Sequence, residues 1–366
     1  MTRLTAEFAM TAICSRQFHH SIHAASIRTL PSLWIKRVGV GCLIALGMSA
    51  AGWSSAQSTA PAEGTERTVN EWLTRIHEAS RQRAYIGTLV VSAGSSMSAS
   101  RIWHVCDGNQ QMERVDTLTG APRTTVRHNN DVITFAPDSK TAWVEKRESL
   151  GVFPDLLRTP DNVIPDHYAV RATGLERVAG HKADVVEIQP RDNLRFGYRI
   201  WSEKKTGLVV KLQTLDGQGQ VLEQVAFTEL QLDAPVSMDK LSKLMKATRG
   251  YEVHRPVLRK TTAEAEGWRL KEAIPGFQSM SCHTRESADG SGATSHPMQW
   301  VFSDGLASVS LFVEPYNEQQ HFEEKAAVIG ATHSLTRRLG QHWLTALGEV
   351  PHSTLLLFAK SLEYTR

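Results

Sequence analysis

The chain has 366 residues, of which 41% are hydrophobic and 22% are charged, and its formal net charge is +3. This composition is typical of a globular protein of about two domains, and it excludes wholesale disorder, a collagen-like repeat and a coiled-coil rod. The small net charge gives no indication of a nucleic-acid-binding protein.

The first predicted element is a signal peptide. The cationic stretch Ile35–Arg37 precedes an uncharged, mostly apolar run, Val38–Ala51. Ser54 and Ala56 then fit the rule for small residues before a cleavage site, so we expect cleavage between Ala56 and Gln57. An uncleaved membrane anchor is the alternative, but the apolar run is short for a bilayer span.

Cleavage would remove residues 1–56, the N-terminal extension and signal peptide, and would leave 36 basic and 37 acidic residues. A neutral chain has no electrostatic reason to bind nucleic acid, and without a second long apolar run we expect no membrane span in the mature chain. Cys106 and Cys282 remain after cleavage. An oxidising compartment favours a disulfide between them, and two buried free thiols are the alternative.

A large domain is predicted over residues 66–232. Thr68 and Glu71 form a capping-box pattern, which predicts a helix over about residues 69–83. Its apolar face consists of Trp72, Leu73, Ile76 and Ala79. About eleven runs rich in β-branched and aromatic residues follow, with short connections that require antiparallel pairing. These runs are Tyr85–Ser92, Arg101–Asp107, Gln111–Thr117, Thr124–His128, Val132–Phe135, Thr141–Lys146, His167–Ala172, Ala183–Gln189, Arg195–Ser202, Leu208–Leu215 and Val221–Leu232.

The predicted fold class is α+β with mainly antiparallel strands: a large, strongly curved half-barrel with the helix against its concave side, and a smaller domain. Residues 233–262 form a predicted linker with one short helix, and residues 263–366 form the small α+β domain. Pro351 suits the first turn of a terminal helix. The predicted elements of the small domain are strands at Gln278–Thr284, Met298–Phe302, Leu306–Val313, Thr332–Leu339 and His342–Leu347, and a helix at Ser353–Leu362.

The sequence contains no catalytic motif and no glycine-rich phosphate loop after a strand, so we expect neither an enzyme nor a cofactor. His104 and Cys106 lie two residues apart on one predicted strand and therefore share a face. They are either half of a zinc site or ordinary strand residues, and no further ligand at suitable spacing accompanies them.

Two sets of apolar residues are candidate binding residues. A helix-covered half-barrel is a concave container that can hold an acyl chain, although ordinary core packing is the alternative. The candidate lipid-pocket residues are Trp72, Ile76, Trp103 and Trp201. In the small domain, the candidate partner-binding residues are Trp300, Phe302 and Phe312 of a predicted hairpin. Trp300 and Phe302 share one face of the first strand, and Phe312 shares a face of the second strand with Ser308 and Ser310. One face must meet the terminal helix, and the other is covered either by the large domain or by a bound peptide segment.

Several ordered motifs resemble the RseB/MucB family over nearly the whole predicted mature chain. They are Ile102–His104, Glu113-Arg114, Thr119–Arg123, Val178–Ala183, Pro190–Tyr198, Thr206–Leu208, Leu222–Gln224, Trp268, Pro275–Phe277, Ser303–Leu306 and Gly348–Pro351.

This resemblance implies a periplasmic negative regulator of the sigma-E envelope-stress response. Such a protein would bind the periplasmic region of an RseA/MucA-like anti-sigma factor and shield it from site-1 proteolysis. The resemblance also implies that the large domain is LolA-like and that binding of lipid or lipopolysaccharide releases the anti-sigma factor. A periplasmic lipid or lipoprotein carrier of LolA type is the alternative, although a simple carrier does not need a second domain. A secreted hydrolase is a third hypothesis, without a motif to support it.

Overall fold

The structure is a computed structural model that describes residues 68–146, 164–285 and 297–365. The predicted signal peptide and its cleavage site at Ala56–Gln57 lie outside these ranges. No helix in the described ranges combines the length and hydropathy of a membrane span.

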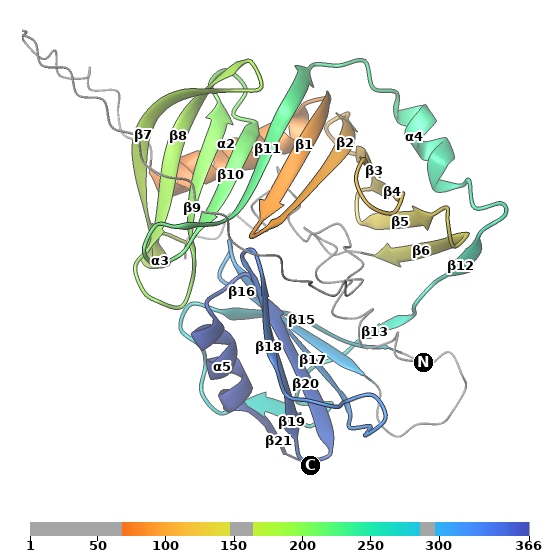
Figure 1. The fold of residues 1–366 in the computed structure, drawn as a ribbon, viewed down its shortest axis with the longest axis vertical. Helices are drawn as coiled ribbons and strands as arrows, with labels where there is room; N and C mark the ends of the chain where they lie inside the picture. Colours follow the sequence, from red (N-terminus) through yellow and green to blue (C-terminus); the bar gives the residue numbers. More distant parts are fainter. Residues whose placement is uncertain (1–67, 147–163, 286–296, 366) are drawn as a thin grey trace, which may run out of the picture. The chain divides into compact units, whose positions relative to one another are not determined.

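The larger of the described sheets has twelve strands in the order β12-β6-β5-β4-β3-β2-β1-β11-β10-β9-β8-β7. Figure 1 shows the strand direction turning steadily from β7 to β6, so the sheet is strongly twisted. Its strands are β1 (Tyr85–Ala93), β2 (Ser96–Cys106), β3 (Gln111–Thr117), β4 (Thr124–His128), β5 (Asp131–Ala136), β6 (Thr141–Lys146), β7 (Tyr168–Val178), β8 (His181–Pro190), β9 (Gly197–Glu203), β10 (Val209–Leu215), β11 (Val221–Leu232) and β12 (Glu252–His254).

Two antiparallel meanders, β1–β6 and β7–β11, make up this sheet apart from β12, and they meet where β1 pairs with β11. In β1, buried and partly exposed residues alternate without a break from Tyr85 to Ala93. Such alternation is the period of a strand whose side chains point to opposite faces. The buried set faces Val225 and Phe227 of β11 in register, which fixes the junction of the two meanders.

Helix α2 (Val69–Gln82) covers the large sheet. The predicted capping box is confirmed, because the Glu71 N–H donates to Thr68 Oγ1 over 3.3 Å and the Thr68 N–H donates to a Glu71 carboxylate oxygen over 2.7 Å. Leu73, Ile76 and Ala79 repeat at helical spacing and are buried in one cluster with residues of β8 to β11. A short helix, α3 (Ile164–His167), leads into β7.

The predicted linker contributes a strand to each sheet. It contains helix α4 (Met238–Met245), as expected, and then β12 and β13 (Leu258–Lys260). β12 pairs with β6 in parallel, so the large sheet takes in a strand from beyond residue 232, the predicted end of the large domain. The chain between Lys146 and Glu252 is long enough for the crossover that a parallel pair requires.

The smaller sheet has seven strands in the order β13-β15-β16-β17-β20-β19-β18, and helix α5 (His352–Ser361) follows it with Pro351 as its N-cap. Its strands after β13 are β15 (Gln278–Arg285), β16 (Met298–Ser303), β17 (Ser308–Pro315), β18 (Ala326–Ile329), β19 (Thr332–Leu339) and β20 (His342–Gly348). A further pair, β14 (Trp268–Leu270) and β21 (Leu362–Tyr364), is antiparallel. The predicted fold class, mainly antiparallel β with a large helix-covered sheet and a smaller sheet-and-helix unit, is confirmed.

Candidate functional site

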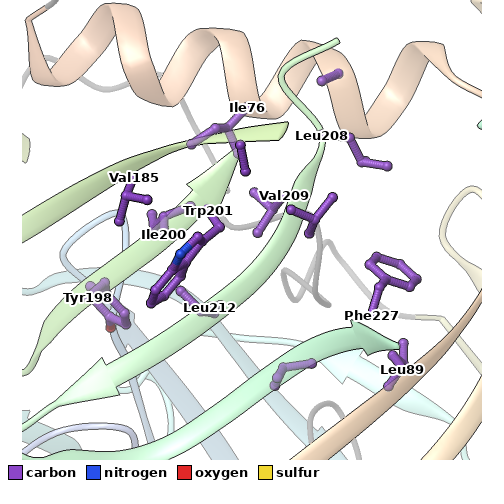
Figure 2. Close-up of a cluster of buried hydrophobic side chains, with 14 of the residues drawn as sticks. Ile76, Leu89, Val185, Tyr198, Ile200, Trp201, Leu208, Val209, Leu212 and Phe227 are labelled. Carbon is purple, nitrogen blue, oxygen red and sulfur yellow. The ribbon is translucent and has the colours of Figure 1, made fainter. Parts of the chain in front are cut away.

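The buried cluster between α2 and the large sheet contains two of the four candidate pocket residues, Ile76 and Trp201. Figure 2 shows Ile76 projecting from α2 toward the sheet, where Trp201 lies close to Ile200 and Leu212. The Trp201 indole Nε1 donates to a Glu176 carboxylate oxygen over 2.8 Å. This indole is therefore a packed, hydrogen-bonded side chain.

The other two pocket candidates lie outside that cluster. Trp72 is buried on α2, and the Arg75 guanidinium lies 5.9 Å from its ring centroid. Trp103 follows Ile102, which points into the cluster, so the Trp103 side chain points to the opposite face of β2. There it lies beneath the Arg114 guanidinium, at 4.9 Å from the ring centroid. The structure thus does not place Trp103 with Ile76 and Trp201, and a lipid-binding role for the four residues stays a prediction.

In the small sheet, the register of the hairpin β16–β17 divides the three candidate aromatic residues between its two faces. Trp300 and Phe302 pack in one cluster with Leu355 and Phe358 of α5, and the rings of Phe302 and Phe358 are 4.9 Å apart. Phe312 pairs with Gln299 and lies on the other face, where it is also buried. Trp300 and Phe302 therefore have a core role, whereas contact between Phe312 and a partner stays a prediction.

The predicted disulfide is wrong, because Cys106 and Cys282 are both free thiols in the structure. Cys282 lies in the core of the small sheet opposite Trp300, and burial raises its thiol pKa to about 12. Cys106 ends β2 of the large sheet and is partly exposed. A buried thiol packs as a small apolar group, so its burial in this core needs no partner sulfur.

His104, the other residue of the candidate zinc half-site, is held by a hydrogen bond and by ring stacking. Its Nδ1 lies 2.8 Å from the carbonyl oxygen of Arg83, and its ring stacks on Tyr85 with centroids 4.9 Å apart. Within the described residues, no group of three or more His, Cys, Asp or Glu side chains is arranged to hold a metal ion. The hydrogen bond and the stacking therefore account for His104 without a metal.

Sequence reasoning missed a charged cluster around Arg195, which was predicted to begin a strand. β9 begins at Gly197 instead, because Arg195 turns away from the ladder and its side chain is completely buried. The sequence does indicate a turn at Asp192-Asn193, just before Arg195, and another at Asp304-Gly305 in the second domain. The pairing of an arginine and an aspartate so far apart has no local sequence signal.

Comparison with known proteins identifies the family. The family model for the MucB/RseB N-terminal domain matches residues 68–245, and that for the MucB/RseB C-terminal domain matches residues 262–363. The chain belongs to the MucB/RseB family. Among its MucB/RseB relatives, the sigma factor AlgU regulatory protein MucB of Pseudomonas aeruginosa is 30% identical over 80% of this chain and 90% of the relative.

A more distant MucB/RseB relative is the sigma-E factor regulatory protein RseB of Escherichia coli, at 22% identity over 85% of this chain and 94% of the relative. Among solved structures, the P. aeruginosa MucA/MucB complex matches with a TM-score of 0.63 and 27% identity, over 81% of this chain and 99% of that chain. A structure of MucB in complex with MucA(peri) matches with a TM-score of 0.60 and 28% identity, over 81% and 98% of the two chains. The family is one of regulatory proteins and not an enzyme family, as the sequence predicted.

Proposed function

We propose that the chain binds the periplasmic region of a MucA-like anti-sigma factor and thereby regulates a sigma factor of the sigma-E/AlgU type. The observation that carries this proposal is the match along the chain to MucB, which was solved in complex with MucA. Because both family models match, in order, we expect the whole folded region rather than one domain to take part.

Two finer steps belong to the same proposal. By occupying the periplasmic segment, the chain would shield it from site-1 proteolysis and so act as a negative regulator in the periplasm. Binding of a lipid or lipopolysaccharide would release the segment and permit cleavage. An acyl chain bound beneath α2 would have to open the packed apolar cluster in which Ile76 and Trp201 are buried.

Binding is tested by fluorescence anisotropy with the labelled periplasmic segment of the anti-sigma factor from the same organism. We expect saturable binding by the full chain, and none of a scrambled peptide of the same composition. Failure to distinguish the two peptides would contradict the proposal. If the correct peptide binds saturably and lipopolysaccharide does not displace it, the result would support anti-sigma-factor binding and contradict release by lipid.

Phe312→Ala adds residue-level information to this assay. Weaker peptide binding with an unchanged melting temperature would place Phe312 at the interface. Loss of stability comparable with that of Trp300→Ala, a core aromatic truncation worth about 3–5 kcal/mol, would make Phe312 structural. Trp300 is the matched comparison because it lies on the opposite face of the same hairpin and packs in the core beside α5.

A further inference from the structure

The loop between β8 and β9 is anchored on elements of the small-sheet region. The Leu194 carbonyl accepts a hydrogen bond of 2.8 Å from Thr354 Oγ1 on α5, and Leu194 packs against the core of the small sheet. The Phe196 ring meets His333 of β19 edge to face, with centroids 5.4 Å apart. This loop belongs to Pro190–Tyr198, one of the motifs in the family resemblance, and its position gives that motif a physical role.

Arg195 is the charged centre of this contact. Its side chain is 0% exposed, and its Nε donates to Asp304 Oδ2 over 2.7 Å. Nη2 donates to the Pro275 carbonyl oxygen over 2.8 Å, and Nη1 donates to the Asp192 carboxylate. The guanidinium also lies 5.0 Å from the ring centroid of Phe277. All three guanidinium nitrogens therefore have acceptors, which a buried arginine requires.

Asp304 is equally well satisfied, and its side chain is also 0% exposed. Oδ1 accepts the backbone N–H groups of Leu306 and Ala307, over 2.9 and 2.7 Å, which fixes the carboxylate in the turn between β16 and β17. Oδ2 receives Arg195 and also the hydroxyl of Tyr168, over 2.8 Å. The turn thus holds Oδ1, while both bonds to Oδ2 come from the large-sheet region.

Two glycines give this cluster its space. Gly276 has φ +79°, and a Cβ atom there would collide with the Arg195 guanidinium and lie 2.6 Å from His167 Nε2. Gly305, next to Asp304, has φ +98°, and a Cβ atom there would lie 2.8 Å from Ile164 Cγ1. Both positions combine a left-handed backbone with a close approach, which only glycine permits without strain. Three motifs that lie far apart in the sequence therefore meet at one buried ion pair: Pro190–Tyr198, Pro275–Phe277 and Ser303–Leu306.

A buried ion pair stabilises only the arrangement in which both charges keep their partners, because each charge left alone in the interior is strongly unfavourable. We propose that Arg195 and Asp304, with Tyr168, form a latch that couples the large-sheet and small-sheet regions into one cooperative unit. The latch acts because separation of the two regions would take the Arg195 and Tyr168 donors away from Asp304 Oδ2, and the Asp304 and Pro275 acceptors away from the Arg195 guanidinium.

Asp304→Asn tests the latch, because the asparagine oxygen can still accept the Leu306 and Ala307 N–H groups while its NH₂ faces the donors of Arg195. Asp216→Asn is the matched control, since Asp216 Oδ1 caps the β10–β11 turn in the same way, accepting the N–H groups of Gln218 and Gln220. The full chain is measured by scanning calorimetry and small-angle X-ray scattering. We expect one unfolding transition in the unmodified protein and in the control.

For Asp304→Asn we expect two resolved transitions and a larger radius of gyration. A single transition with unchanged scattering would overturn the proposal, as would two independent transitions in the unmodified protein. If Asp304→Asn fails to fold, Tyr168→Phe decides the question, because it removes one hydrogen bond to the same carboxylate and keeps both charges. The expected result is a broadened or split transition, and an unchanged profile would overturn the latch.

Discussion

Glu314 on β17 is a carboxyl group whose pKa burial raises from 4.5 to about 7. Its Oε1 lies 3.3 Å from His321 Nε2. The His321 ring stacks on Trp343 with centroids 4.9 Å apart, and its Nδ1 accepts the Asn317 N–H over 2.9 Å. Burial also lowers the pKa of His321. Both shifts favour the neutral form of the group, as expected for a pair in a poorly hydrated environment.

The raised pKa of Glu314 makes stability fall with rising pH. Between pH 4.5 and about 7 the folded protein keeps a proton that the unfolded chain releases, so the free energy of unfolding decreases across this window. Glu314→Gln removes this decline. We expect the variant to match the unmodified protein near pH 4.5 and to exceed it by at most about 3 kcal/mol at pH 8. Urea unfolding at both pH values measures the difference.

Glu318→Gln is the control for that measurement, because its side chain is exposed in the segment that follows β17. Its pH profile should follow that of the unmodified protein. His321 acts in the opposite direction, since a lowered pKa costs stability as pH falls through 6.5, and the control variant keeps the contact of His321 with Glu314. Equal stability of Glu314→Gln and the unmodified protein at pH 8 would show that Glu314 ionises without cost.

The two thiols should differ in reactivity. We expect unfolded, unreduced protein without residues 1–56 to react with a thiol reagent at both Cys106 and Cys282. In the folded protein Cys106 should react faster, because it is partly exposed, whereas burial raises the Cys282 pKa to about 12 and blocks access. Labelling followed by peptide mass spectrometry gives both rates. If neither cysteine reacts in the unfolded, unreduced chain, the two thiols are joined in a disulfide.

At the level of elements, α2 depends on its N-terminal cap. Thr68→Ala removes the acceptor for the Glu71 N–H and should lower the free energy of unfolding by about 1 kcal/mol. Thr68→Ser keeps a hydroxyl acceptor and should lower it by less. Denaturant unfolding of the two variants measures the cap. Equal losses for Ala and Ser would indicate that the side-chain methyl group, rather than the hydrogen bond, stabilises the helix.

Local patterns predicted most elements because their causes are local. The capping box fixed the start of α2, and turn residues such as Asp216-Gly217 separated strands that pair with their neighbours. β12 was missed because three residues of a polar linker carry no strand signal, and their pairing with β6 depends on a distant edge. The start of β9 was wrong because Arg195 is held by Asp304 and not by its neighbours in sequence.

At the level of the whole molecule, the candidate site was less predictable than the fold. Helical spacing correctly placed Ile76 in the core beneath α2. The register of β16 with β17 puts Phe312 on the face opposite Trp300 and Phe302, and alternation within each strand does not give that register. Alternation along β2 also puts Trp103 on the face opposite Ile102, a consequence that the pocket prediction did not use. The two cysteines were paired from their compartment alone, which carries no information on where the folded chain brings them.

The strands on either side of residues 255–257 determine where the chain can be divided. Glu252–His254 complete an edge of the large sheet, and Leu258–Lys260 complete an edge of the small one. A break at either family-model boundary, after residue 245 or before residue 262, would transfer or remove one of these edge strands and leave unpaired backbone exposed to aggregation. A break between Arg255 and Val257 leaves both sheets complete. We therefore expect a protein divided there to form two polypeptides that keep all their own strands and reassociate through contacts such as Arg195–Asp304.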